Sequence, residues 1–259
     1  MYHCVVIAAQ RRNFILEILH QEGAVSISAL AERMSISSVT IRRDLDHLNS
    51  IGLLTRTHGG AIAEVSSPES SYVEKIGQAM PEKQAIGRLA ASLVRDGDVV
   101  IVGPGTTTEA FANILRARSG LTIITNSLPV AEAFVSSPDN EVIMTGGSLR
   151  APIRALVGET TNRTLRGLHA DKTFISGNGL VADFGLSTPN ISVADSDRAM
   201  AAASQQIIVL ADHTKLGVRT AIQTIATDAI THVVTDTKSP GEEVEALTAR
   251  GVNVHVVSA

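Results

Sequence analysis

Four short segments of Gly, Thr, Ser and Asn have the composition of an anion-binding site. They cover residues 103–108, 125–127, 145–148 and 176–179, and each follows an apolar run of strand length. Glycine lets backbone N–H groups approach a ligand closely, hydroxyl side chains add donors, and a following helix adds its positive end. In an open α/β sheet such loops gather at the carboxyl edge, where ligands bind. Together they predict a phosphate site that needs no metal and no cofactor.

The candidate ligand-binding residues are those of the four loops together with a cation from a fifth loop, residues 210–217. They are Gly105, Thr106, Thr107, Thr108, Asn126, Ser127, Gly146, Gly147, Gly177, Asn178, Gly179 and Lys215. His213 lies beside Lys215 in the sequence and is a further candidate for contact with the ligand. No lysine follows the glycines, so this is not a P-loop, and the loops do not form a dinucleotide fingerprint.

A second group of chemistry-bearing residues lies near the N-terminus, where residues 25–45 have the spacing of a helix-turn-helix. Such a motif places its second helix in the major groove of DNA. Hydroxyl groups can bond to phosphates or bases, and arginine can bind guanine or phosphate through two hydrogen bonds. The candidate DNA-binding residues are Ser37, Ser38, Thr40, Arg42, Arg43, Arg56 and His58.

Three helices and a β-hairpin must position these side chains. Phe14, Ile15, Ile18 and Leu19 form one apolar stripe, which predicts a helix over residues 11–20. A second helix is expected near Ser28, which we take as its N-cap, and a third from Ser37 through about Leu48. The third helix carries Ile41, Leu45 and Leu48 on one face. Two short strands around the Gly59-Gly60 pair are expected to form a wing.

The rest of the chain reads as apolar strands separated by helices. A helix is expected over about residues 82–94. The expected strands are Val99–Val102, Thr122–Thr125, Glu141–Met144, Thr173–Ser176, Gln206–Leu210, His232–Thr235 and Val252–Val257. Apolar runs without strict alternation indicate strands covered on both faces, and intervening helices indicate a mostly parallel sheet. The predicted fold is therefore α/β: a small winged helix-turn-helix over residues 1–63, a Ser- and Pro-rich linker over 64–80, and a larger α/β domain over 81–259.

Composition excludes several classes of protein. Of the 259 residues, 44% are hydrophobic and 19% charged, enough to build a sizeable core. The one cysteine, Cys4, excludes an intramolecular disulfide and a cysteine-rich zinc site, and it fits a cytoplasmic protein. No apolar stretch is long enough to span a membrane, and the histidines show no metal-binding spacing. The net charge of −4 argues weakly against nucleic acid, but basic and acidic residues balance in residues 1–64.

Residues 39–45, Val-Thr-Ile-Arg-Arg-Asp-Leu, and residues 53–61, Leu-Leu-Thr-Arg-Thr-His-Gly-Gly-Ala, closely resemble the hallmark of the DeoR family of bacterial regulators. The resemblance implies that the third helix is the recognition helix and that the protein represses transcription. Members of the family are usually oligomeric. A helix-turn-helix that reads a palindrome also requires at least a dimer, so we expect a homo-oligomer, a dimer or tetramer.

Residues 105–107, 125–127, 146–147, 170–175 and 210–217 are similar to the sensor domain of the same family. This resemblance implies a fold like that of ribose-5-phosphate isomerase and a phosphorylated sugar or polyol as effector. The chain departs from the family at Gly103-Pro104, where many members have Asp-Ser, which puts the particular sugar in doubt. It also departs at Asp197-Arg198, where a Lys-Arg pair is usual. Only Arg198 is carried over as an effector-binding candidate.

We therefore expect a repressor of a sugar or polyol metabolism operon, with double-stranded operator DNA and a phosphorylated sugar as partners and no catalytic residue. The alternative is an isomerase-like enzyme with an added DNA-binding domain, which would need a carboxylate base. The loop over residues 176–179 has none, and Asp183 is expected in a solvated turn. Asp195 and Asp197 are the possible substitutes for that base, but we expect them to be helix-surface charges. A third alternative is a scaffold whose winged helix binds protein.

Overall fold

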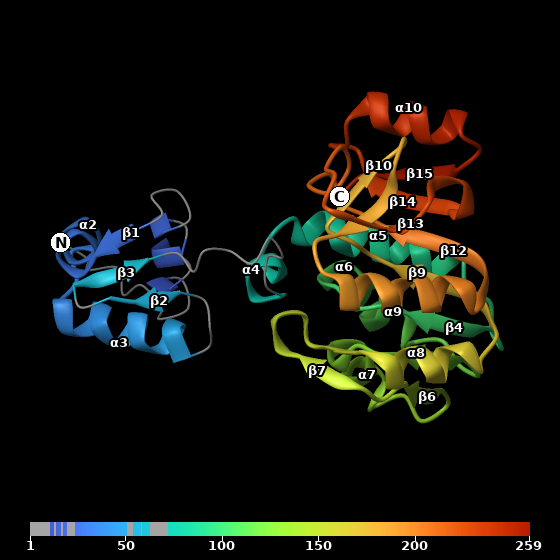
Figure 1. Ribbon diagram of the computed structural model, residues 1–259, viewed down its shortest axis with the longest axis horizontal. Coiled ribbons are helices and arrows are strands. Elements are labelled where there is room, and N and C mark those ends of the chain that lie inside the picture. The colour runs from blue at the N-terminus through green and yellow to red at the C-terminus, as the bar shows by residue number, and fades with distance from the viewer. Residues whose placement is uncertain are drawn as a thin grey trace. The chain divides into compact units, whose positions relative to one another are not determined.

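The computed structural model describes residues 11–12, 14–16, 18–19, 24–50, 54–57, 59–62 and 72–259. The chain divides into two compact units, Met1–Pro68 and Glu69–Ala259 (Figure 1). No helix within the described residues has the length and apolar character needed to cross a membrane.

The first unit combines short helices with a small antiparallel sheet. Its elements are β1 (Ala24–Ser26), α2 (Ile27–Met34), α3 (Ser38–Ser50), β2 (Thr55–Arg56) and β3 (Gly60–Ile62). The strand order is β1-β3-β2, so the expected wing is present as β2 and β3. Helix α2 begins earlier than expected, because the Ser26 hydroxyl accepts a hydrogen bond from the Ala29 N–H at 3.1 Å and Ser28 lies inside the helix.

The core of the first unit is formed by the apolar faces that the sequence predicts. Ile41, Leu45 and Leu48 of α3 are buried against Ile15 and Leu30. The described residues between 11 and 19 are helical, as predicted. Phe14 is the exception to the expected stripe: it is 45% exposed. At 3.6 residues per turn, the arc defined by residues 15, 18 and 19 leaves residue 14 at its margin.

The second unit is built on a seven-stranded parallel sheet. Its strands are β4 (Val99–Val102), β5 (Thr122–Thr125), β6 (Glu141–Met144), β9 (Ala170–Ile175), β12 (Ser204–Leu210), β14 (His232–Asp236) and β15 (Asn253–Val257). The order is β15-β14-β12-β9-β4-β5-β6. Every strand that the sequence predicts is present in this sheet, and the prediction of a mostly parallel sheet is confirmed.

Helices cover both faces of the sheet (Figure 1). They are α4 (Tyr72–Ile76), α5 (Met80–Ser92), α6 (Thr106–Leu115), α7 (Leu128–Phe134), α8 (Glu159–Arg166), α9 (Ile191–Ala202) and α10 (Gly241–Ala249), with short 3-10 turns at Ala151–Ile153 and Thr227–Ala229. In β4, Val100 and Val102 pack with α5, α6 and α7, whereas Ile101 packs with α8, α9 and α10. This two-sided burial explains why the strand sequences are apolar without alternation.

Two smaller antiparallel sheets were not expected from the sequence. One pairs β7 (Ser148–Arg150) with β8 (Ala155–Val157). The other has the order β10-β11-β13, with bounds Gly179–Val181, Gly185–Thr188 and Ile222–Ile225. The second unit also begins earlier than the expected domain start at residue 81, because α4 lies within the range assigned to the linker.

The order of the strands creates a switch point. From β4 the chain adds β5 and β6 on one side, then returns to place β9 on the other side of β4. The loops that leave β4 and β9 therefore diverge at the carboxyl edge. In open α/β sheets this divergence forms the crevice in which ligands bind.

Candidate functional site

A cavity lies at the carboxyl ends of β4 and β9 and holds about 620 Å³ of empty space, its open mouth included. Two of the predicted glycine-containing loops, after β4 and after β9, form part of its wall. The lining residues are Tyr72, Lys75, Pro104, Gly105, Thr106, Thr107, Ile153, Ser176, Gly177, Asn178, Thr188, Val193, Asp197, Asp212 and Lys215.

The N-terminus of α6 faces this cavity. Its N-cap is Gly105, which has no side chain to satisfy the first N–H groups, and the helix begins at Thr106. Those N–H groups have no acceptor within a helix, so Thr106 and Thr107 bring donors and the positive end of the dipole to the cavity wall. Thr108 is fully buried and turns inward, where its hydroxyl donates to the Gly105 carbonyl at 2.9 Å. The arrangement can bind an anion.

The loop after β9 forms the opposite part of the wall. Asn178 is held there, because its N–H donates to the Ser187 carbonyl at 2.9 Å and its side-chain oxygen accepts from the Thr188 hydroxyl at 3.3 Å. A Cβ at Gly177 would lie 2.7 Å from a methyl carbon of Leu186, so a larger residue here would require that side chain to shift. Gly179 belongs to β10 and lies outside the cavity.

Two lysines and two carboxylates line the cavity: Lys75, Lys215, Asp197 and Asp212. The expectation that Asp197 is a helix-surface charge is wrong, because the residue is 2% exposed. Its place in α9, four residues after Val193, puts it on the helix face that packs inward, a spacing that the sequence already contained. The side chain of Asp195 is half exposed, as expected, and Asp183 lies in an exposed turn.

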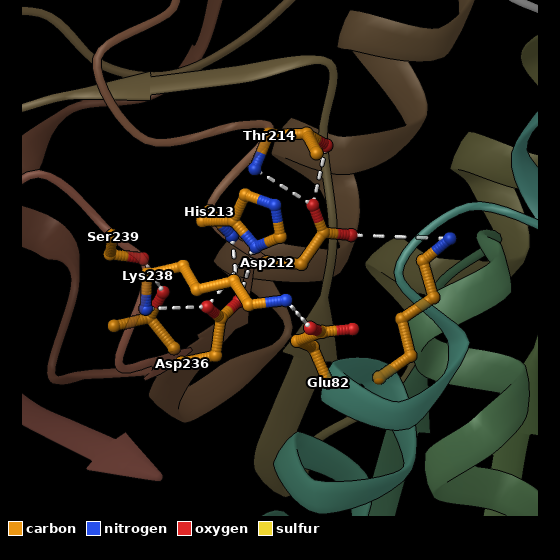
Figure 2. A network of polar contacts seen from close by, with 9 residues as sticks. Glu82, Asp212, His213, Thr214, Asp236, Lys238 and Ser239 are labelled. Carbon is orange, nitrogen blue, oxygen red and sulfur yellow. Dashed lines mark hydrogen bonds and ion pairs between the residues drawn. The ribbon is translucent and has the colours of Figure 1, made fainter. Parts of the chain in front are cut away.

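A polar network fixes the fifth predicted loop (Figure 2). One oxygen of Asp212 accepts hydrogen bonds from the Thr214 N–H at 3.0 Å and from the Thr214 hydroxyl at 2.5 Å. Its other oxygen lies 4.0 Å from Nζ of Lys83, which is buried. Burial lowers the pKa of Lys83, and the charge of Asp212 opposes that shift. The network positions Asp212 at the wall with its charge partly balanced.

His213 belongs to the same polar network. Its backbone N–H donates to the Asp236 carboxylate at 2.8 Å, and its ring nitrogen Nδ1 lies 3.1 Å from both Asp236 oxygens (Figure 2). Asp236 also accepts from the Lys238 N–H at 2.9 Å. His213 is not among the residues that line the cavity, so its position indicates a structural role. Within the described residues, no group of three His, Cys, Asp or Glu side chains could hold a metal ion.

The loop after β5 is used differently from expectation. Asn126 and Ser127 are each 1% exposed and lie outside the cavity. The Asn126 side chain donates to the Leu156 carbonyl at 2.8 Å, and the Ser127 hydroxyl caps α7 by accepting from the Val130 N–H at 3.4 Å. The β7–β8 hairpin covers this loop and pairs with the Asn126 side-chain N–H group, whereas the buried Oδ1 of Asn126 has no hydrogen-bond partner among the described residues.

The remaining candidates also lie outside the cavity. The Gly146 carbonyl accepts from the Thr161 hydroxyl at 2.7 Å, and a Cβ at Gly147 would meet that hydroxyl oxygen at 2.3 Å. These glycines allow the loop after β6 to pack closely on α8. Arg198 donates to the Gln223 carbonyl at 2.5 Å and to Asp195 at 3.1 Å, which ties α9 to β13.

The segment over residues 170–175 has a structural role at the other edge of the sheet. The Asp171 carboxylate accepts from the Val99 N–H at 2.8 Å, and Lys172 pairs with Asp98 at 2.5 Å. Hydrogen bonds from the backbone and from Lys172 outweigh burial and hold the pKa of Asp98 below its usual value. These contacts join the amino ends of β4 and β9, the two strands whose other ends carry the cavity.

In the first unit, α3 presents the predicted polar face. Ser37 caps the helix as expected, because its hydroxyl accepts from the Thr40 N–H at 3.2 Å and lies 2.9 Å from the Thr40 hydroxyl. The side chains of Ser38, Arg42 and Arg43 are exposed. The N-terminal half of α3 therefore offers hydroxyl and guanidinium groups to solvent, as a groove-reading helix requires.

Sequence reasoning did not single out Asp44, which is 1% exposed and anchors α3. It accepts hydrogen bonds from the guanidinium groups of Arg11, at 2.5 and 3.1 Å, and Arg12, at 3.0 Å. Burial acts to raise its pKa, but the two arginines outweigh burial and hold the pKa below its ordinary value. The signal in the sequence is its position beside Leu45, on the inward side of the helix.

Arg56 ties the wing to α3. Its side chain donates to Asp46 at 2.9 Å and to the Gly60 carbonyl at 2.8 Å, and its N–H donates to the Asn49 side chain at 3.0 Å. The guanidinium therefore shapes the hairpin in addition to any contact with DNA. His58, the other wing candidate, lies outside the described residues.

Comparison with known proteins agrees with this architecture. Residues 11–67 match the model of the DeoR-like helix-turn-helix domain, and residues 78–237 match that of the DeoR C-terminal sensor domain. A transcriptional regulator of the helix-turn-helix type from Escherichia coli K12 is 35% identical over 97% of this chain and 98% of its own length. The glycerol-3-phosphate regulon repressor of the same organism is 30% identical over 95% of this chain and 98% of its own length.

A lactose phosphotransferase system repressor from Streptococcus mutans is 32% identical over 88% of this chain and 91% of its own length. Among solved structures, ribose 5-phosphate isomerase from Methanocaldococcus jannaschii is 17% identical, with a TM-score of 0.39 over 52% of this chain and 53% of that chain. The two family models and the near full-length relatives together show that this chain belongs to the DeoR family of DNA-binding transcriptional regulators.

Proposed function

We propose that the protein represses an operon of sugar or polyol metabolism in the cytoplasm, and that a phosphorylated sugar or polyol in the cavity controls its affinity for the operator. The relatives named for the glycerol-3-phosphate regulon and the lactose phosphotransferase system support this class of target. A homo-oligomer binds the DNA, because two recognition helices are needed to read a palindrome.

The observation that carries the proposal is the combination of groups around one cavity. The α6 N-terminus offers amide donors, and Lys75 and Lys215 add positive charge, which suits a phosphate. Asp197 and Asp212 are acceptors, which suits the hydroxyl groups of a sugar or polyol. Both sets of groups meet at the switch point of the sheet, where ligands of such folds bind.

On the DNA side, the proposal assigns α3 to the major groove. Ser38, Thr40, Arg42 and Arg43 read or grip the operator, and Ser37 orients the helix start. Arg56 supports the wing and reaches the adjacent phosphate backbone.

We expect a sugar phosphate from a panel of pentose, hexose and polyol phosphates to raise the melting temperature, whereas the matching unphosphorylated compound does not. A ligand at a hundred times its Kd stabilises the folded state by about 2.7 kcal/mol, which corresponds to a shift on the order of 5 °C. A thermal-shift assay measures this. Lys215→Met should reduce the shift, and Arg250→Met, at an exposed basic residue outside the cavity, should not. Equal shifts with and without the phosphate would contradict the anion site.

We also expect the cavity to be catalytically silent. The loop after β9 has no carboxylate, and Asp212 is held by Thr214 near Lys83. Asp197 is the other carboxylate that lines the cavity, so it is the residue to test. An isomerase assay with pentose and hexose phosphates should show no turnover. Turnover that disappears in Asp197→Asn would establish the enzyme alternative.

A further inference from the structure

Helix α4, the first helix of the second unit, forms one side of the cavity. Tyr72 and Lys75 both line it. Tyr72 is 5% exposed. Its hydroxyl donates a hydrogen bond to the carboxylate of Glu109 on α6, and the guanidinium carbon of Arg154 lies 4.5 Å from its ring centroid. These contacts dock the start of α4 on the helix whose N-terminus faces the cavity.

The other end of α4 is held by one buried ammonium group. Nζ of Lys83 donates to the carbonyl oxygens of Lys75 and Gln78, at 2.6 Å each. The same Nζ lies 4.0 Å from the cavity residue Asp212. Lys83 therefore links the C-terminal turn of α4 directly to the cavity wall.

Because of these contacts, a bound anion is expected to stabilise the docked position of α4. Only the docked helix brings Lys75 to the cavity, so an anion at the α6 N-terminus gains the attraction of that ammonium group in that position alone. Glu109 lies on the first turn of α6. If α4 undocked, Glu109 would lose its hydrogen-bond donor Tyr72, and an unpaired carboxylate near a bound anion is unfavourable. A ligand shifts an equilibrium by its difference in affinity for the two states.

We propose that α4 is a strap that closes the effector cavity, and that anion occupancy stabilises its docked position. The strap directly follows residues 63–71, which connect it in sequence to the DNA-binding unit. Binding of an anion in the cavity would therefore change how firmly the chain is held at the point where residues 63–71 end. The inference rests on the proposed anion site at α6, and linkage requires that docking and anion affinity support each other.

Hydrogen–deuterium exchange of the full chain tests the strap, with inorganic phosphate as the probe and chloride at matched ionic strength as the reference. In the wild type, phosphate should slow exchange in peptides covering residues 105–109 and residues 72–79. In Tyr72→Phe, which loses only the hydroxyl, phosphate should still slow residues 105–109, but the slowing over residues 72–79 should be lost. Glu109→Gln should reduce the slowing over 72–79, and Glu159→Gln, an exposed control on α8, should leave it intact.

The results separate the strap from the site on which it depends. Slowing at residues 105–109 without slowing at 72–79 in the wild type would overturn the strap and leave the anion site standing. No slowing at 105–109 would overturn both. If Tyr72→Phe keeps the full slowing over 72–79, or loses the slowing over 105–109 even at a phosphate concentration that offsets its weaker anion affinity, then Tyr72 is not the latch that we propose.

Discussion

Replacing Arg43 by alanine is expected to weaken operator binding by roughly 30- to 20,000-fold while the protein stays folded. A bidentate arginine–guanine contact is worth about 1–3 kcal/mol, and a dimer loses two of them. Arg43 is exposed on the polar side of α3, so its truncation removes no core contact. A substitution of this kind changes stability by about 0.5 kcal/mol or less. Gel-shift titration with the upstream region of its own operon measures the effect.

The matched control is Arg88→Ala, which removes an exposed arginine from α5 in the second unit. It should leave operator affinity unchanged, because α5 is not part of the predicted DNA surface. Unchanged affinity in Arg43→Ala would show that the recognition helix has been placed incorrectly. A uniform loss across operator and random DNA would instead assign Arg43 to phosphate contact, because phosphate contacts carry no sequence information.

Replacing Asp44 by asparagine is expected to destabilise the first unit by about 3 kcal/mol at neutral pH, because removing one partner of a buried ion pair leaves charge unbalanced. Arg11 and Arg12, which both donate to Asp44, are partly exposed, so the effect should lie at the low end of the range for buried pairs. Hydrogen exchange of the α3 amides in the full chain measures the stability of the first unit separately from that of the second unit.

The same substitution should change the pH dependence of stability. The folded-state pKa of Asp44 lies below its ordinary value of 3.8. Its contribution is therefore fully present above about pH 3.8 and is lost as the pH falls through the lower folded-state pKa. The difference between wild type and Asp44→Asn should shrink over that acidic range. Asp46→Asn, at an exposed residue paired with Arg56, should cost less than about 1 kcal/mol. A difference independent of pH would contradict the ion-pair account.

Arg43 and Asp44 are neighbours in the sequence but have different roles: Arg43 is expected to contact DNA, and Asp44 anchors the helix. Asp44 points inward and fixes the helix against Arg11 and Arg12, whereas Arg43 points to solvent. Asp44→Asn is therefore expected to weaken DNA binding indirectly, through the population of folded first unit. The two variants can be distinguished, since only Asp44→Asn should raise exchange rates in α3.

Local sequence determined the main sheet. The strands of an all-parallel sheet are buried on both faces, so each appears as a continuous apolar run such as Val99–Val102. The helix-turn-helix was equally visible, because the face formed by Ile41, Leu45 and Leu48 follows helical spacing. The loops that could bind an anion were found by composition, since glycine and hydroxyl residues after a strand are themselves the signal. These features depend on neighbours within a few residues.

The tertiary structure decided which of those loops line the cavity. The loops after β4 and β9 line it because their strands are neighbours, whereas Asn126 after β5 is covered by the β7–β8 hairpin. It also brought Tyr72 from the expected linker and Asp197 from α9 to the same place. Strand order and the packing of distant helices depend on contacts between residues far apart in the chain. No local pattern of residues records those contacts, so the sequence could nominate the anion-binding groups but not select among them.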